Sequence, residues 1–320
     1  QYTYTVTLRD AGGNSGDPSS PASATTTAGP DVTAPNPNPM TWAATPAAGG
    51  DWLVVHEDFD YASTSIMAGN GGTGFAGPWA YSRNGTSAGY FEVVGAGLSF
   101  TDGSSNVLPV SGNSTVRTIH NGRSEANRIL STAARTALLA DNSTMWFSVL
   151  HERSTNAEHS AFVLGTGTFD VAAGANMDNY VANGEGFGFG SSNSDAVQAV
   201  GFDNLTGLTL DDGGIDASST SLLVGKIVWS PNGGNDTLDL YSVTDLTSEP
   251  TSPIASVSLD LDQSSFDRIA ILSNKDSAAY DEIRLGKRLG SVVGDCSGAD
   301  SDSSITKTAT TATDGSVVEY

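Results

Sequence analysis

Short apolar runs alternate with turn residues along most of the chain. At its start, Tyr2, Tyr4, Val6 and Leu8 are spaced by two, which places them on one face of a strand. Later runs are rich in β-branched and aromatic residues and are separated by Gly, Asn, Asp and Ser, as strands are separated by turns. We expect strands over residues 52–56, 90–94, 144–151, 160–164, 186–190, 221–229, 237–243, 254–259, 266–273 and 280–285. This spacing predicts an all-β fold, an antiparallel jelly-roll sandwich.

One segment, residues 124–139, also fits a helix. Its apolar residues Ile129, Leu130, Ala134 and Leu138 recur at helical spacing, and its Ala and Arg content permits a helix. The pattern alone leaves helix and strand both open here.

The composition divides the chain into zones. Residues 1–30 hold two short strands around a turn, and residues 31–50 continue a Pro-rich stretch that is typical of a stiff, extended linker. Residues 51–295 carry the run of strands described above, and residues 296–320 return to Ser, Thr and Ala. Because Gln1 leads directly into a strand pattern, we expect the chain to be a piece of a longer polypeptide.

The charge of the chain excludes several partners. The chain has 14 Lys and Arg residues and 36 Asp and Glu residues, which gives a net charge of −22. Such a chain repels nucleic acid and anionic lipid and attracts cations, among which Ca²⁺ is the ion that carboxylates bind outside cells. No apolar run approaches the ~20 residues of a membrane span, so we expect no membrane insertion.

The sequence shows no pattern of catalytic residues. Glycoside hydrolysis needs two facing carboxylates, but Glu152 and Glu158 stand isolated and the four histidines are scattered. The Gly-rich run at 187–190 reads as a strand with small residues and not as a phosphate loop. The lone Cys296 cannot form an internal disulfide. We therefore expect a protein that is not an enzyme.

Several pieces of the middle zone resemble the concanavalin A-like, laminin G-like jelly rolls of large secreted bacterial proteins. Their order and spacing fit this family, and the closing D-E-I-R-hydrophobic-G strand is the most specific piece. The matching pieces are EDFDY (57–61), NGGTGFAGPWAY (70–81), YFEVVGAGLSF (90–100), LLVGKIVW (222–229), NDTLDLY (235–241), SFDRIAILSN (265–274) and YDEIRLGKRLGSVV (280–293).

Both ends of the chain resemble parts of fibronectin type III-like modules. YTYTVTLRDAGGNSGDPSSPASATTT is similar to the last two strands of such a module, and TAPNPNPMTWAATPAA to the first strand of the next. SSITKTATTATDGSVVEY is similar to the second and third strands of that next module. The resemblance implies that the jelly roll is inserted between strands of a fibronectin III/Ig-like β-sandwich.

The resemblance to laminarinase-like jelly rolls implies a structural Ca²⁺ site. In those domains an acid of the first strand and an Asp of the last strand help to hold the ion, and Asp58 and Asp281 stand at these places. Carbonyl oxygens near Gly72 or Gly74 would complete the shell. The alternative is that both acids are solvated strand-end residues. The acidic segment 211–216 lacks the spacing of a calcium loop and is interpreted as a solvated turn.

Aromatic residues are candidates for stacking on sugar rings. Trp146 and Trp229 lie in the most apolar strands, so we expect them in the core. Tyr81, Tyr90 and Tyr180 stand next to polar turns and are the better ligand-binding candidates.

Three functions fit the sequence. The first is a secreted, non-catalytic structural repeat unit of an extracellular filament or cell-surface layer, whose strands pair end to end with copies of itself or with neighbouring modules. The second is an adhesin module that binds polysaccharide. The third is a polysaccharide-degrading jelly-roll enzyme. We expect the first, because the chain begins and ends within fibronectin-like modules.

Overall fold

The computed structural model divides the chain into two compact units, which are Gln1–Ala47 with Ser297–Tyr320, and Ala48–Cys296. In the first unit, strand β1 (Tyr2–Tyr4) pairs antiparallel with β2 (Ala22–Ala24). The expected linker over residues 31–50 and the strands over 296–320, with Cys296, lie outside the described residues. The structure describes residues 2–4, 22–24, 52–62, 65–67, 69–83, 91–95, 97–112, 114–118, 123–153, 159–171, 180–191, 196–203, 207–216, 218–274 and 278–294.

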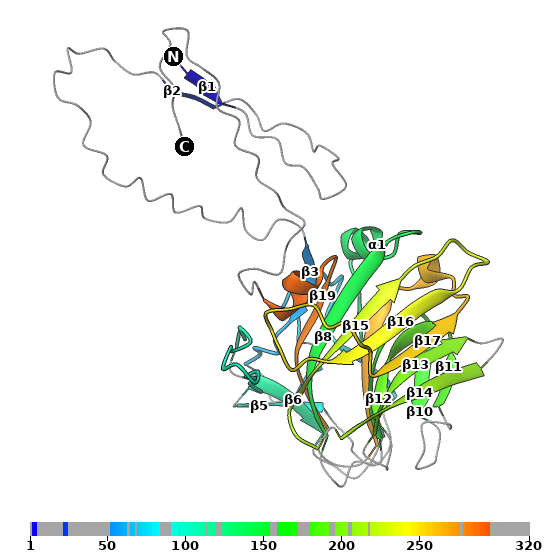
Figure 1. The fold of residues 1–320 in the computed structure, drawn as a ribbon. Coiled ribbons are helices and arrows are strands. Elements are labelled where there is room, and N and C mark those ends of the chain that lie inside the picture. The colour runs from blue at the N-terminus through cyan, green and yellow to red at the C-terminus, as the bar shows by residue number, and fades with distance from the viewer. Residues whose placement is uncertain are drawn as a thin grey trace, which may run out of the picture. The chain divides into compact units, whose positions relative to one another are not determined.

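The second unit is a sandwich of two antiparallel sheets with little helix (Figure 1), so the predicted all-β fold is confirmed. Over the described residues, one sheet has eight strands in the order β17 (Ala255–Leu259), β16 (Asp236–Ser242), β15 (Ser221–Val228), β8 (Thr144–Arg153), β19 (Ala278–Gly286), β6 (Ser114–Thr118) and β5 (Phe91–Gly95), with β3 (Leu53–Glu57) also pairing with β19. The other has seven, β14 (Gly207–Asp216), β13 (Ala196–Asp203), β12 (Gly186–Ser191), β9 (His159–Gly165), β18 (Arg268–Asn274), β7 (Arg123–Ile129) and β4 (Ala80–Arg83). A separate hairpin joins β10 (Thr168–Val171) to β11 (Tyr180–Asn183), and the helices are α1 (Thr132–Leu138), η2 (Gln263–Ser265) and α2 (Leu289–Val293).

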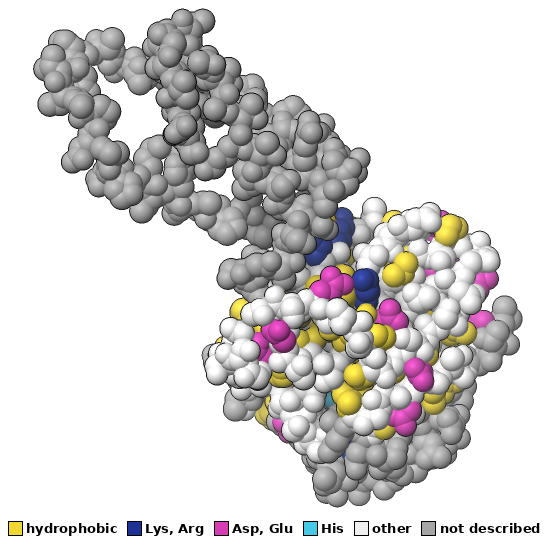
Figure 2. Space-filling view, viewed as in Figure 1, with side chains coloured by type: hydrophobic (Ala, Val, Ile, Leu, Met, Phe, Trp, Pro, Cys, Tyr) yellow, Lys and Arg dark blue, Asp and Glu magenta, His cyan; other side chains and the backbone are white. Residues whose placement is uncertain are grey.

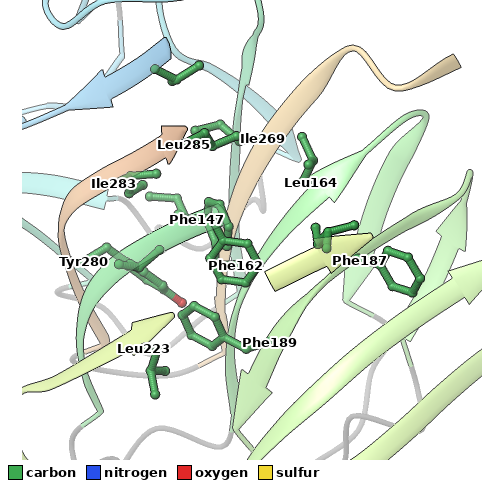
Figure 3. Close-up of a cluster of buried hydrophobic side chains, with 14 of the residues drawn as sticks. Phe147, Phe162, Leu164, Phe187, Phe189, Leu223, Ile269, Tyr280, Ile283 and Leu285 are labelled. Carbon is green, nitrogen blue, oxygen red and sulfur yellow. The ribbon is translucent and has the colours of Figure 1, made fainter. Parts of the chain in front are cut away.

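The core lies between the two sheets, where alternate residues of facing strands meet. Phe147 of one sheet packs against Phe162 and Phe189 of the other, with ring centroids 5.2 and 6.5 Å apart (Figure 3). Trp229, only 1% exposed, closes one part of this core, as expected. Trp146 is buried too, but it belongs to a second cluster on the outer face of the eight-stranded sheet.

The outer faces of both sheets also carry buried apolar clusters. On the seven-stranded sheet, Val163 and Ala270 are fully buried, and β10 of the separate hairpin contacts β18, β7 and β4 of this sheet. On the eight-stranded sheet, the cluster includes Leu98 and Leu108 from residues 97–112, a segment that we call the strap. The strap and α2 therefore bury apolar side chains that a bare sandwich would leave exposed.

The segment 124–139 is strand in its first part and helix in its second. β7 extends to Ile129 and pairs with both β18 and β4, and α1 begins only after Ser131, whose Oγ accepts a hydrogen bond from Ala134 N (3.1 Å). A helix over the whole range would be wrong. The polar residues of β7, among them the buried Arg128, hide its strand alternation from a hydrophobicity pattern.

The acidic segment 211–216 is also part of a strand and not a free turn. It ends β14, whose register against β13 shifts beside Gly214, a residue with φ of 64°. The Asp211 carboxylate accepts a hydrogen bond from Ser256 N of the edge strand β17 (2.7 Å). This acid therefore covers a backbone N–H that an edge strand would otherwise expose.

Gly188, in the centre of the Gly-rich strand β12, should not tolerate a side chain. An added Cβ would overlap the carbonyl oxygen of Phe162 on β9, which pairs with β12 along its length. We expect Gly188→Ala to lower the free energy of unfolding by about 3 kcal/mol, because backbone atoms must move apart. At Gly77 an added Cβ meets nothing within 4 Å, so Gly77→Ala is the matched control in urea unfolding. Equal losses in the two variants would contradict the close approach.

Candidate functional site

The first and last strands of the sandwich close it at one end. β3 pairs antiparallel with β19, and beyond this pair Lys287 N donates to the carbonyl oxygen of Trp52 (2.9 Å). The chain therefore enters and leaves the sandwich at neighbouring points. The predicted metal residues Asp58 and Asp281 belong to this pair of strands and the turn that follows β3.

A bulge in β19 sets the geometry of this region. The register of β19 against β8 shifts between Asp281 and Arg284, and Glu282 has the left-handed φ of 49°. Consecutive side chains of a regular strand point to opposite faces, but here both acids reach the strap. Asp281 Oδ2 accepts a hydrogen bond from Leu98 N (2.8 Å), and Glu282 Oε1 accepts one from Ser111 N. Two adjacent carboxylates thus hold both ends of the strap.

Glu282 also binds Arg284 and His56. Its Oε2 lies 2.7 Å from both Arg284 Nη2 and His56 Nε2, and Arg284 also donates to the carbonyl oxygen of Pro109 in the strap. Burial raises the pKa of Glu282, but the hydrogen bond to His56 and the charge of Arg284 outweigh burial and leave that pKa below its usual range. The carboxylate is therefore ionised when it binds the strap.

His56, Ser111 and Glu282 do not form a nucleophilic relay. Such a relay needs the serine on one ring nitrogen of the histidine and the acid on the other. Here the same nitrogen, His56 Nε2, lies 3.3 Å from Ser111 Oγ and 2.7 Å from Glu282 Oε2. The arrangement cannot pass a proton from serine to acid through the ring. Its hydrogen bonds instead hold the strap to β3 and β19.

The middle of the strap is held by Asp102. Its carboxylate accepts hydrogen bonds from the backbone N–H groups of Leu246 (2.9 Å) and Asn106 (2.8 Å) and from the Asn106 side chain. These hydrogen bonds lower the pKa of Asp102 to about 2, and the bond from Leu246 N has the largest effect. The strap is thus fastened at both ends and at its middle by carboxylates.

The predicted calcium residues make bonds of their own. Asp281 is 2% exposed, and its two oxygens accept hydrogen bonds from the N–H groups of Leu98 and Glu282. Asp58 is half-buried beside Gly112, and its Oδ1 accepts from Asp60 N (3.3 Å). Within the described part of the chain, no three His, Cys, Asp or Glu side chains gather as metal ligands. The Ca²⁺ site stays a prediction.

A buried network that the sequence did not reveal lies on the inner side of β3. Glu57 is fully buried, and its Oε2 accepts hydrogen bonds from Tyr61 Oη (2.6 Å), Trp79 Nε1 (2.9 Å) and Arg128. Arg128 also donates to the carbonyl oxygens of Gly71 and Gly77. Burial, and then the negative charge of Glu57, raise the pKa of the Tyr61 hydroxyl. The network joins the segment after β3 to β7 and leaves no free acid or base.

Two of the predicted ligand-binding tyrosines lie in described strands of the fold. Tyr81 stands in β4 opposite Ala126, and Tyr180 stands in β11 opposite Val171. Tyr90 lies outside the described residues. Their role in binding sugar stays a prediction.

His151, one of the four scattered histidines, is buried at the far end of the core. Its Nε2 lies 2.9 Å from Ser160 Oγ, which in turn lies 2.8 Å from Ser191 Oγ. Its ring lies between those of Phe189 and Tyr280, with centroids 5.3 and 5.2 Å away. Burial, and then the charge of Arg153, lower the pKa of His151 to about 3. The imidazole is neutral and serves as a link between the sheets.

Comparisons with known proteins find structures but no family. No protein-family model matches the chain, and no curated protein matches it. Similar solved structures include the CBM2 module of the evolved Dit protein of Lactobacillus casei phage J-1, with 9% identity over 74% of this chain and 96% of that one and a TM-score of 0.35. A legume lectin-like domain from Entamoeba histolytica has 10% identity over 60% and 87% and a TM-score of 0.35.

A carbohydrate esterase from the Shiga toxin-encoding bacteriophage phi24B is also similar, with 13% identity over 71% of this chain and 100% of that one and a TM-score of 0.37. Structural similarities this weak do not indicate a function.

Among the described residues, no helix is both long and apolar enough to cross a membrane.

Proposed function

We propose that residues 48–296 form a non-catalytic, extracellular module that is presented as a side branch of a longer chain and binds polysaccharide. The observation that carries this proposal is the pairing of β3 with β19, which brings the entry and exit of the chain together at one end of the sandwich. Domain insertion requires ends that lie close together.

The position of these two ends favours a module that projects from the chain over a repeat that lies in line with it and carries force. Tension along a chain that enters and leaves at neighbouring points passes through the β3–β19 pair and bypasses the rest of the sandwich. A repeat that transmits force along a filament would have its ends at opposite poles. Neighbouring entry and exit points therefore support a module that holds a surface out from the chain, as an adhesin module would.

The bonding of the buried acids favours a non-catalytic role. A general acid or base must be able to exchange its proton with a substrate. Glu57 is bound by Arg128, Tyr61 and Trp79, and Glu282 by Arg284 and His56. These carboxylates fasten loops to strands.

Retention on polysaccharide tests the proposal. The full chain is run through gels that contain single soluble polysaccharides, and the reducing ends released from each polysaccharide are assayed in parallel. We expect retardation in at least one gel and no released reducing ends. Release of reducing ends would overturn the non-catalytic part, and normal mobility in a broad panel would overturn the binding part.

A second candidate, the structural repeat unit, rests on the paired strands of the first unit. β1 and β2 form a two-stranded sheet, with Tyr2 opposite Ala24 and Tyr4 opposite Ala22. Two strands are marginally stable in water, so further strands from a copy or a neighbouring module would complete the sheet. Deletion of residues 1–28 should then abolish end-to-end association seen by light scattering and leave the sandwich folded. A full chain that stays monomeric at high concentration would exclude this candidate.

The calcium proposal follows from the resemblance and is tested by chelation. An ion that binds only the folded state adds ~2.7 kcal/mol of stability at a hundredfold excess over its Kd. We expect a chelator to lower the Tm of the natural chain and not that of Asp58→Asn. Asp58 is the better probe, because Asp281→Ala would also remove the bond to Leu98 N. An equal Tm of the natural chain with and without chelator would show that no Ca²⁺ stabilises the fold.

A further inference from the structure

The last element of the second unit, helix α2 (Leu289–Val293), belongs to neither sheet. It has five residues, and its N-cap residue Arg288 makes no side-chain cap hydrogen bond. An isolated helix of this length is unstable in water. The contacts of α2 with β19 and β8 therefore hold it in its helical form.

Two kinds of contact hold α2 on the eight-stranded sheet. The carbonyl oxygen of Val292 accepts hydrogen bonds from Ser148 Oγ of β8 (2.6 Å) and from Arg284 Nη1 of β19 (3.4 Å). Leu289, Val292 and Val293 are buried in the apolar cluster on the outer face of that sheet. Ser148 is only 1% exposed, so its hydroxyl group is shielded from solvent where it meets the helix.

Just before α2, three residues tie the exit of the chain to its entry. We call Trp52, Lys287 and Arg288 the clamp. Lys287 N donates to the carbonyl oxygen of Trp52 (2.9 Å), and the Arg288 guanidinium lies 3.8 Å from the centre of the Trp52 ring. Next to the clamp, β19 pairs with β3 on one side and with β8 on the other. The clamp therefore adjoins a strand that is hydrogen-bonded along both edges.

Tension in the chain would act on α2 before it acts on the clamp. A pull on the segment that follows Gly294 first reaches α2, which adds no hydrogen bonds to the ladder of either sheet. The pull reaches Arg288 and Lys287 only after α2 has detached. Local openings of this kind cost less free energy than global unfolding. Once α2 is detached, the clamp carries the load between the entry and the exit.

We infer that α2 is a cover that tension removes from the outer face of the eight-stranded sheet, while the clamp keeps the sandwich folded. The inference rests on the side-branch arrangement of the proposed function, because such tension needs a chain that continues on both sides of residues 48–296. Detachment uncovers the outer face of β8 and β19, where Trp146 and Ala279 belong to the same apolar cluster as α2. Figure 2 shows hydrophobic side chains on the visible face mostly in small groups among uncharged polar atoms, and the uncovered cluster would differ from that surface.

Thiol labelling under tension tests the cover. The full chain carries Cys296→Ser, which removes its one natural thiol, and Ser148→Cys, and it is stretched by its two ends in magnetic tweezers with a fluorescent maleimide in solution. At a force that does not unfold the sandwich, we expect the labelling rate to rise at least about tenfold, which corresponds to a fall of about 1.4 kcal/mol in the free energy of opening. Ser273→Cys is the matched control and should stay unlabelled, because Ser273 is fully buried on the same face of β18 as the core residue Ile271.

The outcomes separate the cover from the proposed function. Equal rises in the Ser148 and Ser273 variants would show that the sandwich opens as a whole, which would overturn the cover and the side-branch arrangement together. No rise in either variant up to the force of unfolding would overturn the cover and leave the proposed function standing. Trp52→Ala removes the ring that Arg288 contacts and should lower the force at which the sandwich unfolds. An unchanged unfolding force in that variant would overturn the clamp.

Discussion

Arg128→Met should lower the free energy of unfolding by about 3–5 kcal/mol, the cost of leaving a buried charge without its partner. Glu57 has no exposed surface, and Arg128 is its only positively charged partner among the described residues. The guanidinium also lies 3.9 Å from the centre of the Phe75 ring and donates to the carbonyl oxygens of Gly71 (2.7 Å) and Gly77 (2.9 Å). Loss of the guanidinium therefore removes hydrogen bonds that hold the segment after β3, and it also leaves Glu57 without its positively charged partner.

Urea unfolding of three variants tests this role. The double variant Glu57→Gln with Arg128→Met should recover part of the loss, because no charge then remains buried. Lys226→Met breaks the exposed pair with Glu249 and should cost less than about 1 kcal/mol. If Arg128→Met cost no more than Lys226→Met, the buried network would not hold the segment in place.

The strands that the sequence predicted are those with clear apolar alternation. Residues 221–229 and 144–151 were expected as strands and correspond to β15 (Ser221–Val228) and β8 (Thr144–Arg153). β6 and β7 escaped the pattern because their sequences, STVRT and RSEANRI, place Ser, Glu and Arg where a strand usually carries apolar residues. In β7 those polar residues are buried by pairing and ion-pair contacts that only the fold brings together.

The candidate site was less accessible to sequence reasoning. The resemblance drew attention to Asp281, but the bulge that lets Asp281 and Glu282 act together depends on the register of β19 against β8. The only signal in the sequence was the pair of adjacent acids before Ile283, in a strand otherwise apolar.

Stability should fall as the pH drops below about 6.5 because of His151. In the folded protein its pKa is about 3, since burial and the charge of Arg153 oppose protonation, whereas the unfolded chain has the ordinary value of 6.5. Between these values the unfolded state binds a proton that the folded state does not, so each pH unit in this window costs up to about 1.4 kcal/mol. Between pH 6.5 and 4.5 the loss should reach about 2–3 kcal/mol, and below pH 3 the contribution of His151 should stop changing.

His151→Gln isolates this contribution from that of the carboxylates. The glutamine amide can donate to Ser160 Oγ, as the imidazole can, but it does not titrate. The acids titrate alike in both proteins, so the difference between the two curves of unfolding free energy against pH belongs to His151. We expect the natural chain to lose stability more steeply than the variant from pH 6.5 to 4.5, as measured by urea unfolding at each pH. Parallel curves over that range would show that the imidazole is hydrated or charged in the folded state, and that the serine link at the far end of the core does not hold it neutral.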